Sequence, residues 1–135
     1  MKRKIFIPCI IFYSIFISCM SMSNIRKNEL INIDPLLFHK EDTYVLIGKI
    51  KKSPNRFIEI YFIEYLFNST RATYRLVFFD NNSIFCYRVE DRPILINNVL
   101  LFPYGKELGN EIIINDEIPD KIYLNGEVIN KLVIK

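Results

Sequence analysis

Alternation of apolar and polar side chains begins near Thr43 and continues to the end of the chain. Short runs rich in Ile, Val, Phe and Tyr are separated by Asn, Gly, Pro and Asp, which is typical of strands joined by turns. The pattern predicts eight or nine short strands and no convincing helix. The expected strands are Tyr44–Lys51, Phe57–Phe67, Ala72–Phe79, Ile84–Glu90, Ile94–Ile96, Val99–Phe102, Glu111–Ile114, Lys121–Leu124 and Glu127–Ile134.

The clearest hairpin joins Ala72–Phe79 to Ile84–Glu90 across Asn81-Asn82, because asparagine tolerates the positive φ of a two-residue turn. Directly opposed residues share a face of the sheet. The predicted pairs are Phe79 with Ile84, Phe78 with Phe85, Val77 with Cys86, Leu76 with Tyr87, and Arg75 with Arg88. The first face is apolar and belongs in the core (Tyr74, Leu76, Phe78, Phe85, Tyr87, Val89). The second is partly apolar, and we expect it to be partly covered (Arg75, Val77, Phe79, Ile84, Cys86, Arg88).

Two further hairpins are expected, across Asn97-Asn98 and across Asn125-Gly126, the latter being the strongest short hairpin signal in the chain. Residues 43–135 are therefore predicted to form an all-β domain. It is either a small antiparallel sandwich or a closed barrel of about eight strands. Period-two alternation does not distinguish these two architectures.

The N-terminus has the pattern of an export signal. Lys2, Arg3 and Lys4 precede the run Ile5–Ile17, whose 13 residues carry no charge. A membrane-spanning helix needs about 20 apolar residues, and Pro8 would remove one of its hydrogen bonds. Residues 1–18 are therefore predicted to be a signal peptide, with a retained membrane anchor as the alternative.

The apolar run ends in Phe16-Ile17-Ser18-Cys19, which resembles the lipobox of bacterial lipoproteins, although Phe16 stands where leucine is usual. The resemblance covers only residues 1–20. It implies that the thiol of Cys19 receives a diacylglyceryl group and that a peptidase cuts between Ser18 and Cys19. Acylation at two positions anchors a protein stably to a membrane.

The lipobox resemblance also implies a location in the cell envelope. Met20 is not the aspartate that commonly retains lipoproteins in the inner membrane, so the outer membrane is the expected destination in a Gram-negative host. The alternative is simple secretion after cleavage at Ser21-Met22-Ser23, where small residues stand two apart.

Residues 19–42 are predicted to be a lipidated N-terminus and tether. Ile25, Leu30, Ile31 and Ile33 are too irregular for a clear helical period, and Asp34-Pro35 indicates a turn. The segment is either a flexible stalk or a first strand or short helix that packs on the domain.

The formal net charge of +3 belongs to the export signal. Three of the eighteen basic residues and none of the fifteen acidic residues lie in residues 1–18, so the remaining chain has equal numbers of each. A nucleic-acid partner requires a clustered basic surface, and none is expected here.

Few residues suggest catalysis. His39 is the only histidine, and a nucleophilic dyad would pair it with Cys86, yet Cys86 lies mid-strand, where a small buried side chain is usual. Asp116, Glu117 and Asp120 form a carboxylate cluster that is either a weak calcium or hydrolase site or an exposed turn. We expect no metal and no cofactor.

Arg75 and Arg88 are the most informative charged pair, because like charges directly opposed across a sheet are unfavourable. Either Glu59 or Glu64 compensates them in a carboxylate–guanidinium ladder, or the two guanidinium groups contact an anion or an acidic partner.

The sequence therefore indicates a membrane-anchored envelope lipoprotein that is not an enzyme. Its β-domain is expected to bind an envelope protein or polymer or to have a structural role. The alternative is a small secreted or envelope hydrolase that uses the carboxylates near Asp116.

Overall fold

The computed structural model describes residues 23–65, 74–105 and 110–135. The chain divides into two compact units, residues 1–40 and Glu41–Lys135. Ser18 and Cys19 lie outside the described residues. Within those residues, no helix combines the length and the apolar character needed to cross a bilayer.

The first unit contains a helix over residues 23–33. Arg26 and Glu29 form an ion pair of 2.9 Å one turn apart, and Leu30 is fully buried. Of the alternatives left open for this segment, the short helix is therefore present over residues 23–33. The less exposed positions do recur at helical spacing, but Arg26 and Lys27 occupy two of them, so a pattern of apolar residues alone does not reveal the helix.

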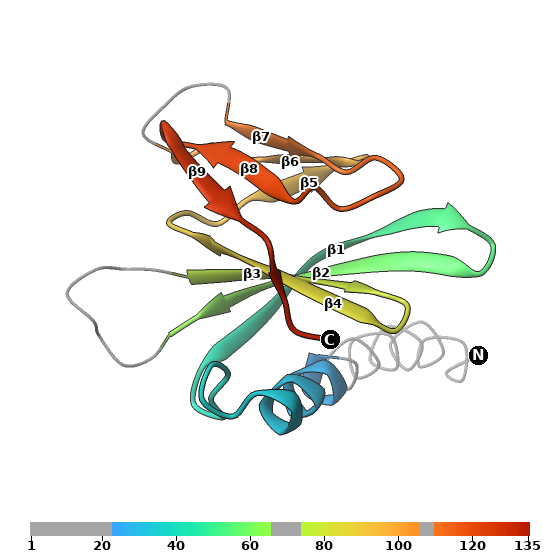
Figure 1. Cartoon of the computed structure of the whole chain (residues 1–135), viewed down its shortest axis with the longest axis vertical. Coiled ribbons are helices and arrows are strands. Elements are labelled where there is room, and N and C mark those ends of the chain that lie inside the picture. The colour runs from blue at the N-terminus through green and yellow to red at the C-terminus, as the bar shows by residue number, and fades with distance from the viewer. Residues whose placement is uncertain (1–22, 66–73, 106–109) are drawn as a thin grey trace, which may run out of the picture. The chain divides into compact units, whose positions relative to one another are not determined.

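The second unit contains ten strands within the described residues, and every pairing between them is antiparallel (Figure 1). The largest sheet has five strands in the order β1-β2-β3-β4-β10. Its members are β1 (Thr43–Ser53), β2 (Arg56–Glu64), β3 (Tyr74–Asp80), β4 (Ser83–Val89) and β10 (Leu132–Val133).

The predicted register of the β3–β4 hairpin is confirmed at all five pairs, from Phe79 opposite Ile84 to Arg75 opposite Arg88. Asn81 has a φ of 54°, which is the left-handed conformation that the turn requires. The strand register and the backbone conformation at the turn therefore both match the prediction for this hairpin.

Two small sheets complete the unit. One has the order β5-β6-β7 and contains β5 (Ile94–Ile96), β6 (Val99–Leu101) and β7 (Glu111–Ile113). The other pairs β8 (Lys121–Leu124) with β9 (Glu127–Asn130). Both predicted turns are present, with positive φ at Asn97, Asn125 and Gly126. The expected strand Glu127–Ile134 is instead divided at Lys131 into β9 and β10, which belong to different sheets.

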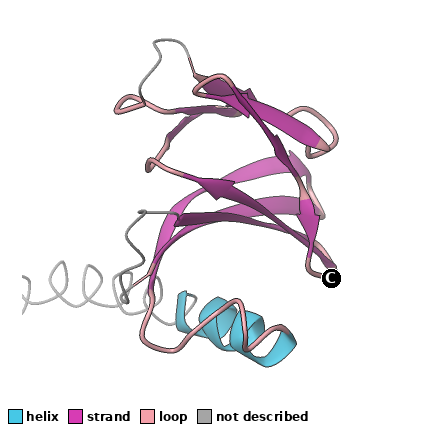
Figure 2. Cartoon of the chain, turned by 60° about the vertical axis from the view of Figure 1, so that its left-hand side comes forward, coloured by secondary structure: helices cyan, strands magenta, loops and turns pink. Residues whose placement is uncertain are grey.

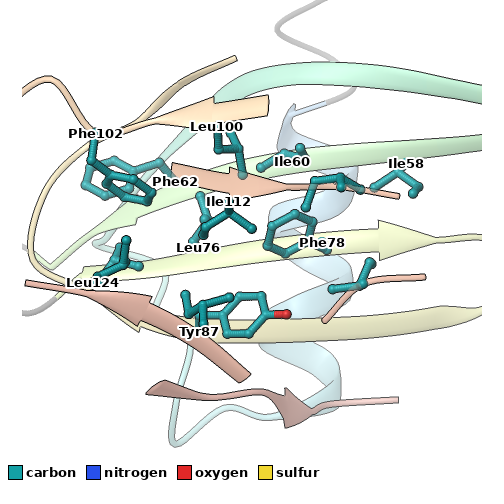
Figure 3. Packing of buried hydrophobic residues seen from close by; sticks show 14 of the residues in the cluster. Ile58, Ile60, Phe62, Leu76, Phe78, Tyr87, Leu100, Phe102, Ile112 and Leu124 are labelled. Carbon is teal, nitrogen blue, oxygen red and sulfur yellow. The ribbon is translucent and has the colours of Figure 1, made fainter. Parts of the chain in front are cut away.

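The core lies between one face of the five-stranded sheet and the inner faces of the two small sheets (Figures 2 and 3). Leu76, Phe78 and Tyr87 contribute from the predicted first face of the β3–β4 hairpin, and Ile60 and Phe62 contribute from β2. From the small sheets and their connections come Leu100, Phe102, Ile112, Ile114, Ile118, Ile122 and Leu124. The sheets are open, with β1 and β10 at the two edges of the largest, so the closed-barrel alternative is not supported.

The second face of the large sheet is also buried over most of its length. Val77, Phe79, Ile84 and Cys86 are each at most 1% exposed and lie outside the cluster between the sheets. The expectation that this face is covered is therefore confirmed, and its cover is more complete than predicted.

Candidate functional site

The opposed arginines occupy one end of the second face. Arg75 on β3 and Arg88 on β4 are direct partners in the antiparallel register. The Nε of Arg75 donates a hydrogen bond of 2.8 Å to the hydroxyl of Tyr65. Arg88 is exposed and forms no hydrogen bond or ion pair with another described residue.

The expected carboxylate–guanidinium ladder is not formed. Glu64 follows Ile63, the residue that opposes Arg75, so strand alternation directs Glu64 to the first face together with Phe62. Glu59 does lie on the second face, but it opposes Phe79 and accepts a hydrogen bond of 3.2 Å from the Tyr61 hydroxyl. Strand parity alone could have excluded Glu64.

A phenol and a thiol surround Arg75 instead. Burial lowers the pKa of Arg75, but the Tyr65 hydroxyl and the Cys86 thiol raise it by more, so its net pKa lies above the ordinary value. Burial raises the pKa of Tyr65, and the bond from Arg75 offsets part of that rise. The pKa of Tyr44 is raised by burial and by the negative charge of Asp42. Arg75 is therefore a permanent cation whose hydrogen-bond partners, a phenol and a thiol, are neutral.

Arg88 also lines a shallow groove between β4 and the β8–β9 hairpin. Val89, Glu90, Leu124, Asn125, Glu127 and Ile129 complete its lining. Asn125 is fixed there because its side-chain oxygen accepts a bond of 2.7 Å from Asn110. Beside Arg88 the groove is therefore lined by two glutamates, one asparagine and three apolar side chains.

Cys86 forms no disulfide with another described residue and is fully buried. Its position matches the interpretation as a small buried side chain packed mid-strand. His39 belongs to the other compact unit of the chain.

The carboxylates near the last hairpin are exposed: Asp116, Glu117 and Asp120 all face solvent. Asp120 forms an ion pair of 3.1 Å with Lys131. No group of three or more His, Cys, Asp or Glu suited to a metal occurs in the part of the chain that the structure describes.

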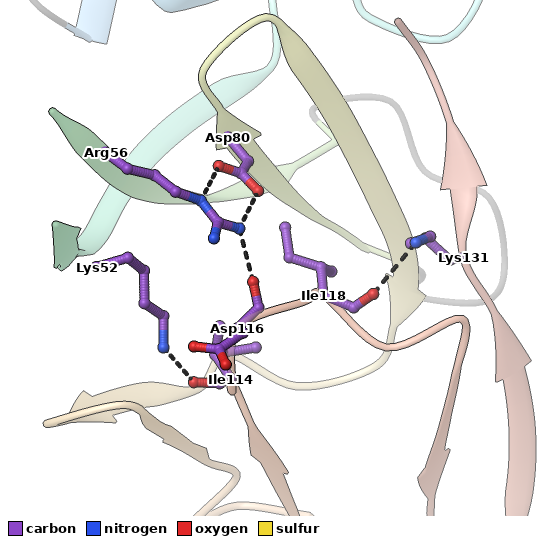
Figure 4. A network of polar contacts seen from close by, with 7 residues as sticks. All are labelled: Lys52, Arg56, Asp80, Ile114, Asp116, Ile118 and Lys131. Atoms are coloured by element: carbon purple, nitrogen blue, oxygen red, sulfur yellow. Dashed lines mark hydrogen bonds and ion pairs between the residues drawn. The ribbon is translucent and has the colours of Figure 1, made fainter.

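The main-chain carbonyl oxygens of residues 114–120 accept more hydrogen bonds from side chains elsewhere in the chain than the three carboxylates do (Figure 4). Lys52 Nζ donates to the carbonyl of Ile114 at 2.7 Å, and Arg56 Nη2 donates to that of Asp116 at 2.7 Å. Lys131 Nζ donates to the carbonyl of Ile118 at 3.1 Å, and the Tyr87 hydroxyl donates to that of Pro119. Three cationic side chains and a phenol thus hold the backbone of this segment in place. These bonds support its interpretation as an exposed structural turn.

Comparison of the chain with protein-family models, with curated protein sequences and with solved structures finds no match.

Proposed function

We propose that this protein is a lipid-anchored, non-catalytic binding module of the cell envelope. In this proposal Arg75 and Arg88 contact an anionic group on an envelope protein or polymer. The observation that carries it is the like-charge pair itself: Arg75 and Arg88 are direct partners across β3 and β4, and Arg75 is bonded to a phenol and a thiol rather than to a carboxylate.

An anion is the natural complement of such a pair. Like charges directly opposed across a sheet are destabilising, and a guanidinium offers a planar fork that fits carboxylate and phosphate oxygens. Arg88 has its fork unbonded among the described residues. A carboxylate or phosphate of a partner at this end of the sheet would relieve the repulsion and supply the contact.

The β-domain suits a presenting role. Its open antiparallel sheets with a core between them support a sandwich-like fold. Lipid attached to Cys19 would place the domain at a membrane surface, in the outer membrane if the host is Gram-negative. Simple secretion is the alternative location.

The anchor is tested by metabolic labelling with palmitate. Label is expected on the wild-type chain and absent from the Cys19→Ser variant. Cys86→Ser, which removes the buried strand cysteine, is the matched control and keeps its label. Label that persists in Cys19→Ser contradicts the anchor.

The binding role is tested by pull-down from membrane fractions with quantitative mass spectrometry. Arg88→Glu reverses the charge of the exposed arginine in the pair, whereas Arg92→Glu makes the same change at another exposed arginine. A partner captured by wild type and Arg92→Glu but lost from Arg88→Glu supports the proposal. Equal capture by all three, with circular dichroism showing intact sheets, contradicts it.

A further inference from the structure

The turn between β8 and β9 contains the only Asn-Gly pair of the sequence, Asn125-Gly126. Asparagine is a chemically labile residue, and a following glycine makes it more so, because no side chain hinders the glycine nitrogen. Asn81, Asn97 and Asn125 have nearly the same backbone conformation, with φ of 54°, 56° and 52°. Only Asn125 is followed by glycine, so the other two turns are comparators for it within one molecule.

A second asparagine holds Asn125 by its side chain and by its main chain. Asn110 Nδ2 donates a hydrogen bond of 2.7 Å to Asn125 Oδ1, and the main-chain N–H of Asn125 donates to Asn110 Oδ1 at 3.4 Å. Asn110 is itself fixed, because its carbonyl accepts a bond of 3.2 Å from the Phe102 N–H. Its Nδ2 would stand only 3.1 Å from a β-carbon at Gly105, so the side chain has little room to turn.

We propose that Asn125 is a site of spontaneous deamidation and that Asn110 slows the reaction. The main-chain nitrogen of Gly126 loses its proton and attacks Cγ of Asn125. The bond from Cγ to Nδ2 breaks, and ammonia leaves with a proton, so a five-membered succinimide ring remains. Water then opens the ring at one of its two carbonyl carbons and gives either aspartate or isoaspartate. Water is the only other reactant, and nothing is oxidised or reduced.

The bond from Asn110 restrains the group that has to move. For Cγ to meet the Gly126 nitrogen, the side chain of Asn125 must rotate, and its bond to Asn110 Nδ2 must break. The loss of one net hydrogen bond corresponds to a factor of about five in rate. The same donor would also make the carbonyl carbon more electrophilic, but only if it followed the rotation. Asn110 is held by Phe102 and closely approached by Gly105, so the restraint prevails.

Deamidation changes both the charge and the backbone of this turn. Aspartate adds a carboxylate to the groove that Asn125 lines together with Arg88, Glu90 and Glu127. Isoaspartate instead adds a methylene to the main chain, so a two-residue turn no longer joins Leu124 to Glu127 in the observed register. The reaction needs no partner, so this inference does not depend on the proposed function.

The test is incubation of the full-length protein in mild detergent at mildly alkaline pH, followed by digestion and mass spectrometry. Aspartate and isoaspartate are measured at Asn81, Asn97 and Asn125 in the same sample, and wild type is expected to be modified fastest at Asn125. Asn110→Ala raises the rate at Asn125 about fivefold. Asn98→Ala, which removes a side-chain amide bonded to a main-chain carbonyl at another turn, leaves the rate at Asn125 unchanged.

Two further measurements separate the restraint from a general loss of structure. Asn110→Asp keeps the size of the side chain but has no amide donor, and it raises the rate as Asn110→Ala does while circular dichroism shows intact sheets. In urea the rates of wild type and both variants become equal. Modification of Asn81 or Asn97 as fast as that of Asn125 overturns the proposal. So does a native rate in both variants at or below that of wild type, or a difference that persists in urea.

Discussion

Arg56 holds Asp80 through both arms of its guanidinium, with Nε 3.0 Å from Oδ1 and Nη2 2.8 Å from Oδ2. The pair joins the start of β2 to the end of β3, and the same Nη2 continues to the carbonyl of Asp116. One side chain therefore connects two strands of the large sheet to the segment that leads into β8.

Replacement of Arg56 is expected to destabilise the domain. Arg56→Ala removes the ion pair and leaves the Asp116 carbonyl without this donor, whereas Arg56→Lys keeps the charge but loses the planar fork. The urea midpoint should fall in both, and further for Arg56→Ala. Arg88→Ala, at an arginine with no bond to another described residue, should unfold at the wild-type midpoint or above it, because it removes a like charge opposite Arg75. A fall for Arg88→Ala as large as that for Arg56→Ala would contradict the assignment.

The β3–β4 turn offers a matched pair of asparagines. Asn81 has a φ of 54°, and the neighbouring Asn82 has no positive φ. Asn81→Ala is expected to cost about 1 kcal/mol, because a β-carbon disfavours the left-handed conformation. Asn82→Ala should be nearly neutral, and Asn81→Gly should keep wild-type stability or exceed it. Thermal unfolding of the three variants checks this order.

Gly48 on β1 lies directly against Leu95 on β5. A β-carbon at position 48 would stand 2.6 Å from Cδ2 of Leu95, so that side chain would have to move. Gly48→Ala is expected to destabilise the protein by about 1 kcal/mol through overpacking. The double variant Gly48→Ala, Leu95→Ala should be more stable than the sum of the single effects predicts. Strict additivity in urea unfolding would show that the two positions do not meet.

Alkaline stability follows from the buried phenols. Burial and the charge of Asp120 raise the pKa of Tyr87, and burial and Asp42 raise that of Tyr44. A folded-state pKa above the unfolded value of about 10 stabilises the fold fully below that pH. The contribution is lost as the pH rises through the folded pKa, so the free energy of unfolding should fall steadily above about pH 10.

Tyrosinate absorbance and urea midpoints at alkaline pH measure this fall. Tyr87→Phe removes one of the groups and should make the decline shallower. Tyr123→Phe, at an exposed phenol on β8, is the control and should keep the wild-type slope. A steeper decline in Tyr87→Phe would contradict the assignment.

Cys86 should be inert in the native protein. Its side chain has no exposed surface, and a thiol must be reached by solvent to be alkylated. Iodoacetamide at neutral pH is expected to label Cys86 only after urea is added, as mass spectrometry of the peptide that contains it would show. Rapid native labelling would revive the nucleophilic role.

The sequence predicted local pairing well and long-range contacts poorly. The registers about Asn81, Asn97 and Asn125 follow from alternation and turn chemistry, which act over a few residues. The division of the last strand at Lys131 does not follow from alternation, because it accompanies contacts with a segment that precedes the hairpin. The Lys131 side chain donates to the carbonyl of Ile118 and forms an ion pair with Asp120. A carbonyl is present at every residue, so no side-chain pattern marks the ones that become acceptors.

The candidate site likewise contains one contact that the sequence predicted and one that it did not. The opposition of Arg75 and Arg88 is a consequence of register and was predictable. Alternation in the expected strand Phe57–Phe67 puts Tyr65 on the face of Arg75, but it does not say which side chain on that face Arg75 bonds, so the Tyr65 hydroxyl was not predicted as its partner.

The strand β10 gives the large sheet an order of assembly. β1 to β4 are consecutive in the chain, but β10, the neighbour of β4 on its other side, follows β5 to β9, and the Ile134 amide beyond it is bonded to the Ile84 carbonyl at 2.8 Å. A chain that is synthesised from its N-terminus therefore leaves one side of the β4 backbone unpaired until β10 has been made. During that interval the unpaired edge is open to the wrong strand.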